Sequence, residues 1–167
     1  MLPRFLAALA LLVPTASLAA QDAPLTVFVV RHAEKGPENP DPSLTDAGQR
    51  RAAALAKTLA DARVSALFAS EFKRTQETVG PLARANGLTS TVVPAGRMDS
   101  LIAKLRALPP GSRAVVASHS NLVHLIAERL SGQKMPMLTE ADYDRLVVVT
   151  VQGDGKGQLM VLRYGEP

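Results

Sequence analysis

Hydrophobic positions along this chain fall into two kinds of block that alternate: compact apolar runs, and stretches in which apolar residues are spaced three and four apart. Compact runs of apolar, mostly β-branched or aromatic residues predict strands at 25–30, 66–69, 89–93 and 114–118. Apolar residues spaced three and four apart predict helices at 45–62, 74–86, 98–108 and 121–130. Two more strands, at 146–151 and 158–163, flank a glycine-rich turn that is typical of a hairpin. This order predicts a single α/β domain, a three-layer sandwich whose mostly parallel central sheet is covered on both faces.

Individual residues mark the ends and interruptions of these elements. Thr45 is the expected N-cap of the first helix, and Asn86-Gly87 is the expected end of the second. Gly80-Pro81 predicts a kink or a break inside the second helix. We expect the segment 131–144 to be irregular and, together with the loop 36–43, to shape the mouth of any pocket at this end of the sheet.

The first twenty residues have the pattern of a secretory signal peptide. Arg4 supplies a short positive region, residues 5–13 are an unbroken apolar run, and small residues at 17–20 offer cleavage after Ala19 or Ala20. A run of this length is too short to span a bilayer of about 30 Å as a helix. We therefore expect a signal peptide at 1–20 and a domain at 21–167 that is periplasmic or secreted and does not stay inserted in a membrane. An uncleaved membrane anchor is the alternative.

Composition narrows the classes of function. The chain has 167 residues, of which 47% are hydrophobic and 20% charged, so it can bury one substantial core. It has no cysteine, which excludes disulfides and lipid attachment at an N-terminal cysteine. The 19 basic and 15 acidic residues give a net charge of +4, and loss of Arg4 leaves +3. Because the cations are not gathered in a run, nucleic-acid binding is disfavoured and a local site for an anionic substrate fits better.

Arginine and histidine follow three of the predicted strands. Arg31-His32 comes directly after the first strand, Arg74 after the second and His119 after the fourth. Because the carboxyl ends of parallel strands meet at one edge of a sheet, these side chains should converge there. Arginine suits phosphate oxygens, histidine can act as a nucleophile, and the helix starts at Arg74 and Ser120 attract anions. The sequence thus predicts a site for phosphoryl transfer.

Four segments resemble, in order, the motifs of the histidine phosphatase superfamily, also called phosphoglycerate mutase-like. They are Arg31-His32-Ala33-Glu34 after a strand, Leu44-Thr45 followed by Gly48, the segment 70–78 around Arg74, and His119-Ser120-Asn121. The resemblance covers nearly all of residues 25–163. It implies a phosphoglycerate mutase-like fold and a phosphoric monoester hydrolase that needs no metal or cofactor. Its substrate would be a small-molecule or macromolecular phosphate ester.

The resemblance also implies roles for the clustered residues. His32 would take the phosphoryl group on nitrogen, Arg31, Arg74 and His119 would hold its non-bridging oxygens, and water would hydrolyse the phosphohistidine.

The leaving oxygen needs a proton donor, and the sequence leaves this residue open. The family branch with aspartate after the second histidine is disfavoured, because Ser120 stands there. Asp99 is the first candidate, because it lies between the third strand and third helix, where the resemblance to the mutase-like branch implies the acid. Glu34, two residues from the nucleophile, is the competitor. A substrate with a good leaving group would need neither.

Other functions stay open at this point. A non-catalytic phosphoryl-binding module would need the same pocket without turnover, and a phosphomutase usually needs more chain to enclose its intermediate. A serine hydrolase with Ser120 in a nucleophile elbow is disfavoured, because Ser118 and Leu122 stand where that motif has glycine. His124 lies about 140° around a helix from His119, so we interpret it as structural, and no spacing supports a zinc site.

Overall fold

The computed structural model describes residues 23–38 and 40–166, which form strands and helices in alternation. The predicted signal peptide at 1–20 lies outside the described residues. The elements are β1 (Leu25–Arg31), α1 (Asp46–Thr58), β2 (Ala66–Ala69), α2 (Lys73–Asn86), β3 (Ser90–Val92), α3 (Met98–Arg106), β4 (Arg113–Ser118), α4 (Ser120–Ser131), β5 (Arg145–Val151) and β6 (Gly157–Arg163). The predicted order of elements is therefore confirmed, with boundaries shifted by a few residues.

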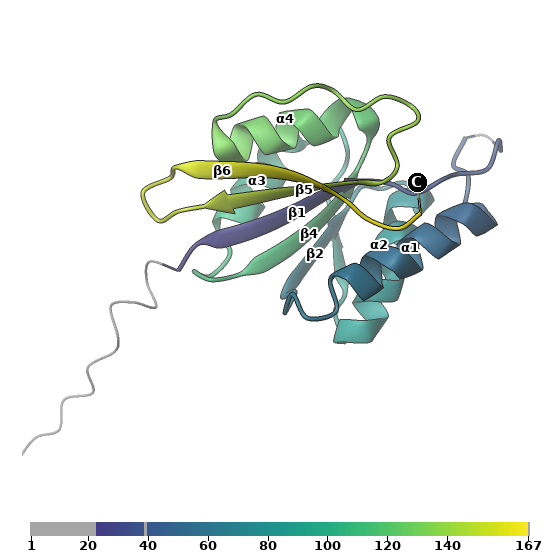
Figure 1. Ribbon diagram of the computed structural model, residues 1–167, viewed down its shortest axis with the longest axis horizontal. Coiled ribbons are helices and arrows are strands. Elements are labelled where there is room, and N and C mark those ends of the chain that lie inside the picture. The colour runs from purple at the N-terminus through teal and green to yellow at the C-terminus, as the bar shows by residue number, and fades with distance from the viewer. Residues whose placement is uncertain (1–22, 39, 167) are drawn as a thin grey trace, which may run out of the picture.

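The strands form one six-stranded sheet in the order β3-β2-β4-β1-β5-β6. Strands β3, β2, β4 and β1 are parallel neighbours, whereas β5 and β6 add an antiparallel hairpin beside β1. Helices lie on both faces of this sheet, with α1 and α2 on one side and α3 and α4 on the other (Figure 1). The three-layer α/β sandwich with a mostly parallel sheet is confirmed.

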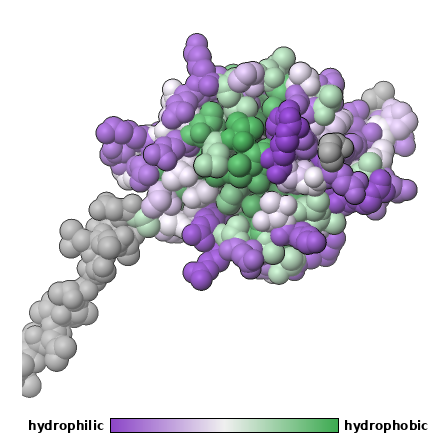
Figure 2. All heavy atoms as spheres, viewed as in Figure 1, coloured by the Kyte–Doolittle hydropathy of each residue, from purple (hydrophilic) through white to green (hydrophobic). Residues whose placement is uncertain are grey.

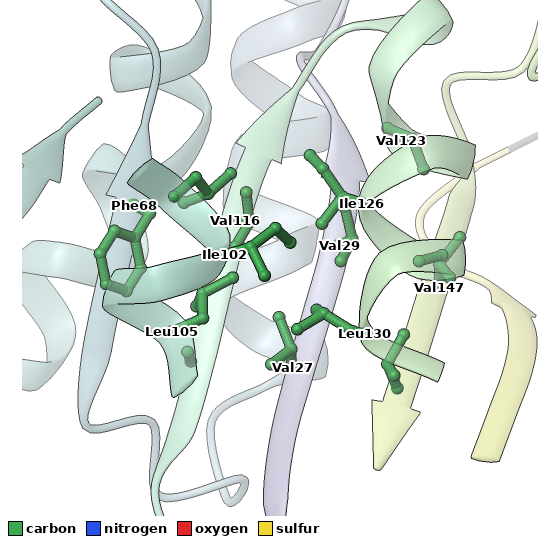
Figure 3. Close-up of a cluster of buried hydrophobic side chains, with 14 of the residues drawn as sticks. Val27, Val29, Phe68, Ile102, Leu105, Val116, Val123, Ile126, Leu130 and Val147 are labelled. Carbon is green, nitrogen blue, oxygen red and sulfur yellow. The ribbon is translucent and has the colours of Figure 1, made fainter. Parts of the chain in front are cut away.

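A separate apolar core fills each space between sheet and helices. One joins β1, β4 and β5 to the inner faces of α3 and α4, through residues such as Val29, Leu105 and Ile126 (Figure 3). The other joins the opposite face of the sheet to α1 and α2, through residues such as Leu55 and Leu82. Alternate residues of the strands thus point into different cores, which fixes the register of the sheet.

Two local predictions have different outcomes. The N-cap at Thr45 is confirmed, because its hydroxyl accepts a hydrogen bond from the Gly48 amide at 3.2 Å. Of the kink or break predicted at Gly80-Pro81, the break is wrong, since α2 runs through Pro81 without interruption to Gly87, its left-handed C-cap. The buried face of α2, with Val79 and Leu82 packed on the sheet, stabilises the helix despite the amide hydrogen bond that Pro81 lacks.

The outer strand β6 leaves apolar side chains in contact with solvent. Met160, Val161 and Leu162 are between 43% and 58% exposed. An apolar area is visible on the face that carries β5 and β6 (Figure 2). Among the helices of residues 23–38 and 40–166, none is both long and apolar enough to cross a membrane.

Candidate active site

The pairing of β1 with β4 brings the two predicted site histidines together. Arg31 and Ser118 are partners in the parallel register, and the next amide, of His32, donates to the Ser118 carbonyl at 2.8 Å. The His32 and His119 rings therefore lie side by side at the carboxyl edge of the sheet. Their centroids are 5.4 Å apart and the rings are inclined by 65°.

The backbone fixes the proton position on His32. Its Nδ1 lies 2.8 Å from the Ala33 carbonyl, which can only accept, so Nδ1 carries the hydrogen and Nε2 keeps its lone pair. Burial, together with the nearby charges of His119, Arg31 and Arg74, lowers the pKa of His32 to about 4, against the raising effect of the Ala33 hydrogen bond. The imidazole is therefore neutral at ordinary pH and has a free nitrogen, as a nucleophile requires.

The second imidazole is held by a chain of hydroxyl groups. The Thr75 hydroxyl donates to the Phe72 carbonyl at 2.8 Å, so it accepts from the Ser70 hydroxyl at 2.9 Å. His119 Nε2 then donates to the Ser70 oxygen at 3.0 Å, which leaves Nδ1 for a ligand. Burial and the charge of Arg74 together lower the pKa of His119 to about 4. An anion in the pocket would favour the protonated ring.

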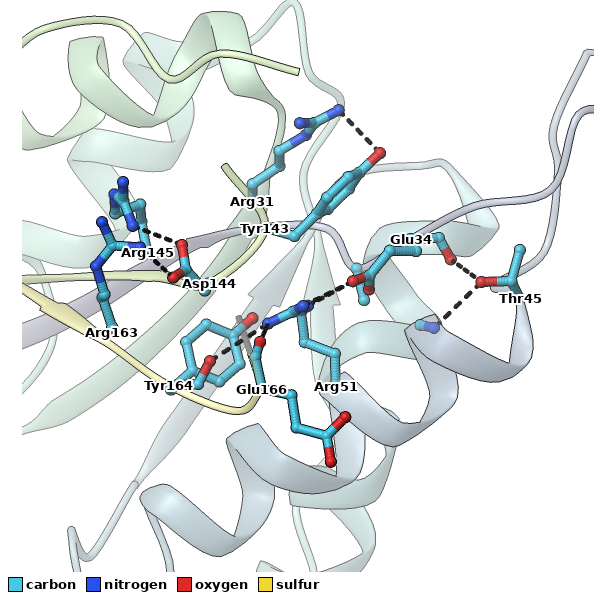
Figure 4. Close-up of polar contacts among 12 residues, drawn as sticks. Arg31, Glu34, Thr45, Arg51, Tyr143, Asp144, Arg145, Arg163, Tyr164 and Glu166 are labelled. Carbon is cyan, nitrogen blue, oxygen red and sulfur yellow. Dashed lines mark hydrogen bonds and ion pairs between the residues drawn. The ribbon is translucent and has the colours of Figure 1, made fainter. Parts of the chain in front are cut away.

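The Arg31 guanidinium is buried and largely occupied. Nη1 donates to the carbonyls of Thr139 and Glu140 at 3.0 and 2.8 Å. Nη2 donates to the Glu140 carboxylate at 2.6 Å and to the Tyr143 hydroxyl at 3.2 Å (Figure 4). Only Nε, which is buried, has no partner, so this donor is available to an anion bound beside His32.

Arg74 enters the site from the first turn of α2. Its guanidinium stacks 4.3 Å from the centroid of the Phe72 ring, and Nη1 lies 3.8 Å from an Asp41 carboxylate oxygen. Its Nε is also buried without a partner. Two arginines thus keep an unpaired donor in the same neighbourhood, where both lower the pKa of His32 and His119.

An open pocket connects these groups to solvent. Its lining includes Arg31, His32, Arg74, His119, Ser120 and Glu140. His119 is the N-cap of α4 and makes no side-chain cap bond, so the amides of the first turn point a positive dipole end at this pocket. The four residues predicted to converge therefore do so, in a pocket suited to a tetrahedral oxyanion.

Sequence comparison relates this arrangement to a family. The sequence model described as histidine phosphatase superfamily (branch 1) matches residues 27–96, from β1 to the turn after β3. The predicted resemblance to the histidine phosphatase superfamily is thus confirmed over these residues. No curated protein matches it significantly.

Several solved structures share this fold. The protein histidine phosphatase SixA, complexed with tungstate, is 23% identical over 83% of this chain and 96% of its own, with a TM-score of 0.69. A mycobacterial glucosyl-3-phosphoglycerate phosphatase is 15% identical over 84% and 99%, with a TM-score of 0.67. A phosphoglycerate mutase from Plasmodium falciparum is 18% identical over 87% and 96%, with a TM-score of 0.65. At these identities the likeness establishes the phosphoglycerate mutase-like fold.

The structure does not bring Asp99 into the pocket of the two histidines. Asp99 lies in the first turn of α3, its side chain is 86% exposed, and it pairs with Arg129 at 3.0 Å. The direction of α3 points the carboxylate toward α4 rather than toward His32. The family resemblance suggested this residue from its place between β3 and α3, and a place in the order of elements does not specify the direction of a side chain.

Glu34 is close to His32 in sequence but turns away from it. One carboxylate oxygen accepts from Nε and Nη2 of Arg51, each at 2.8 Å (Figure 4). Arg51 also donates to the carbonyls of Tyr164 and Glu166, so this ion pair joins the loop after β1 to α1 and to the chain after β6. Glu34 does not line the pocket of the two histidines, and its contacts are those of a structural residue.

Sequence reasoning missed Glu140 and Tyr143, which contact Arg31 from the loop between α4 and β5. This loop was predicted only to shape the pocket mouth. No periodicity or spacing marked either residue, because an irregular segment does not fix side-chain directions. His124 lies on α4 outside the pocket lining, and no cluster of three metal-binding side chains occurs within the part of the chain that the structure describes.

Proposed function

We propose that this protein hydrolyses phosphate monoesters through a phosphohistidine intermediate on His32, without a metal ion. One observation carries the proposal: His32, with its free Nε2, lines one pocket with two arginines, each of which has a buried Nε that lacks a partner. Such donors are costly to bury unless a ligand completes them. A phosphoryl group beside His32 would provide acceptor oxygens for both.

The chemistry follows from positions and charges. Nε2 of His32 attacks phosphorus in line with the ester oxygen, and the bond to the leaving group breaks as the N–P bond forms. Arg31, Arg74, a protonated His119 and the first turn of α4 neutralise the charge on the non-bridging oxygens. A water molecule then attacks the phosphohistidine, releases inorganic phosphate and restores neutral His32.

Proteins with the same fold support the proposal of an oxyanion pocket, but their names point to different substrates. They include a protein histidine phosphatase complexed with tungstate, a glucosyl-3-phosphoglycerate phosphatase and a phosphoglycerate mutase. The openness of the pocket to solvent favours hydrolysis over the mutase alternative, because a mutase must keep its intermediate away from water. A phosphoryl-binding module would keep the pocket and lack turnover.

The experiment measures phosphate release from 4-nitrophenyl phosphate by the protein that begins at Gln21, with and without a chelator. Wild type should be active in both, form an acid-labile phosphoenzyme, and lose both properties in His32→Ala. His124→Gln, which removes a histidine outside the pocket, is the matched control and should stay active. Abolition by the chelator would refute the metal-free mechanism. Phosphate binding without turnover on a panel of phosphoesters and phosphohistidine would favour the binding module.

We also propose that the protein is exported, to the periplasm or the medium, and that residues 1–20 direct this step. The support is the pattern of Arg4, the apolar run and the small residues before Gln21. Expression of the full chain in a Gram-negative host should give a shortened periplasmic protein. Mass spectrometry should place its first residue at Ala20 or Gln21. Retention of the full chain in the membrane fraction would refute the proposal.

A further inference from the structure

The site described above has two histidines and two arginines but no assigned proton donor. Of the acidic residues between 23 and 166 that the structure describes, Glu140 alone lines the pocket. Asp99 and Glu34 are paired with Arg129 and Arg51 outside it. Among the described residues, Glu140 is therefore the carboxylate placed to reach a ligand in this pocket.

Glu140 stands on the side of the pocket where a leaving group departs. His32 is buried, with 4% exposure, whereas the side chain of Glu140 is 83% exposed at the mouth. An attack in line from Nε2 expels the ester oxygen away from the buried ring, and therefore toward the mouth. A carboxyl group there has the position that a general acid needs.

The carboxylate is held at this place by both of its oxygens. Oε2 accepts from Arg31 Nη2 at 2.6 Å, and Oε1 accepts from the Ser120 hydroxyl at 3.0 Å. Arg31 and Ser120 are themselves pocket residues, so Glu140 spans from the end of β1 to the start of α4.

The loop that carries Glu140 is anchored on either side of it. The Thr139 amide and hydroxyl donate to the Asp142 carboxylate at 2.8 and 2.6 Å. Asp144 then accepts from Arg145 and Arg163 of the terminal hairpin (Figure 4). These contacts hold the irregular loop in place, so that the Glu140 carboxyl group is presented to the pocket.

We infer that Glu140 is the general acid and base of the reaction, a role that rests on the proposed phosphatase function. In the first step, protonated Glu140 gives its proton to the ester oxygen as the P–O bond breaks and the N–P bond to His32 forms. In the second, the Glu140 carboxylate takes a proton from the attacking water as phosphorus is released from His32. Each cycle returns Glu140 to its protonated form, so protons balance.

A bound substrate would favour the protonated form of Glu140, which a general acid needs. In the free protein, the Ser120 hydrogen bond and the charge of Arg31 lower the pKa of Glu140. A phosphoryl group beside Arg31 competes for that cation and brings negative charge near the carboxylate. Both effects favour the protonated acid while substrate is bound.

The test compares Glu140→Gln with wild type on two substrates, glycerol phosphate with a poor leaving group and 4-nitrophenyl phosphate with a good one. Gln keeps an acceptor for Ser120 and nearly the same size, and a circular-dichroism melt checks that it folds. Asp61→Asn is the matched control, because Asp61 is an exposed carboxylate in the turn after α1. We expect kcat/KM of Glu140→Gln to fall about 100-fold on glycerol phosphate and less than about 5-fold on 4-nitrophenyl phosphate.

The outcomes separate this inference from the proposed function. Equal loss, equal gain or no change on both substrates, in an enzyme that still forms the phosphoenzyme at His32, overturns the role of Glu140 alone. An equal gain would mean that Glu140 merely competes with substrate for Arg31. Absence of wild-type activity on both substrates overturns the inference and the proposed function together.

Discussion

Replacing Glu34 by Gln separates a structural carboxylate from a catalytic one. The change keeps the shape of the side chain and removes its charge. Arg51, whose side chain is 9% exposed, would then lose its charged acceptor and have only neutral ones, among them the carbonyls of Tyr164 and Glu166. Burial lowers the pKa of Arg51, but the hydrogen bond and charge of Glu34, with the charges of Tyr164 and Asp144, together raise it above its ordinary value. An arginine is not deprotonated in proteins, so the guanidinium stays charged in wild type and in the variant.

The expected loss of stability follows from this partial burial. Breaking a fully buried pair costs about 3–5 kcal/mol, and a hydrogen bond to a charged group contributes about 1.5–3 kcal/mol. Because the Glu34 side chain is 23% exposed, water replaces part of the lost interaction. We expect Glu34→Gln to lower the free energy of unfolding by about 2 kcal/mol, which lowers the melting temperature by roughly 5–8 °C for a domain of this size.

Urea unfolding and a thermal melt measure the stability, and phosphate release from glycerol phosphate measures activity below the melting temperature. Glu34→Gln should retain kcat/KM within about threefold, because Glu34 faces Arg51 and not the pocket. The double variant Glu34→Gln/Arg51→Gln should lose less stability than the two single losses combined. Unchanged stability together with a loss of activity confined to the poor leaving group would refute this reasoning and restore Glu34 as the proton donor.

Three further outcomes are expected. The unfolded chain binds protons with a histidine pKa of 6.5 while His32 and His119 stay neutral to about pH 4, so the free energy of unfolding should fall by up to about 2 kcal/mol per histidine from pH 7 to pH 5. His119→Gln should flatten this fall in urea titrations, and an unchanged slope would contradict the neutral burial of that ring. Gly48→Ala would place its Cβ 2.2 Å from the Glu34 carbonyl oxygen, so about 2–3 kcal/mol of stability and much of the activity should be lost, whereas Gly96→Ala, with nothing within 4 Å, should melt like wild type. Asp99→Asn should change stability by less than about 1 kcal/mol and leave turnover of glycerol phosphate intact, because its pair with Arg129 is exposed, and a large loss of turnover would show that α3 reaches the pocket in solution.

The sequence by itself determined the architecture and the centre of the site. Compact apolar runs identified the strands and a period of 3.6 residues identified the helices, because a strand buried on both faces is apolar throughout and a helix buried on one face is apolar along one stripe. Since parallel strands end at one edge, the positions of Arg31, His32, Arg74 and His119 after their strands were enough to predict that they meet. These inferences needed only the direction of the chain along each element.

Only the tertiary structure decided where the carboxylates lie. Glu34 is near His32 in sequence but is drawn to Arg51, and Asp99 follows the expected strand but faces Arg129. Glu140 comes from the irregular loop between α4 and β5, and it reaches Arg31 because contacts with the terminal hairpin hold that loop. The direction of a side chain in such a loop depends on partners more than a hundred residues away, and no local pattern in the sequence records them.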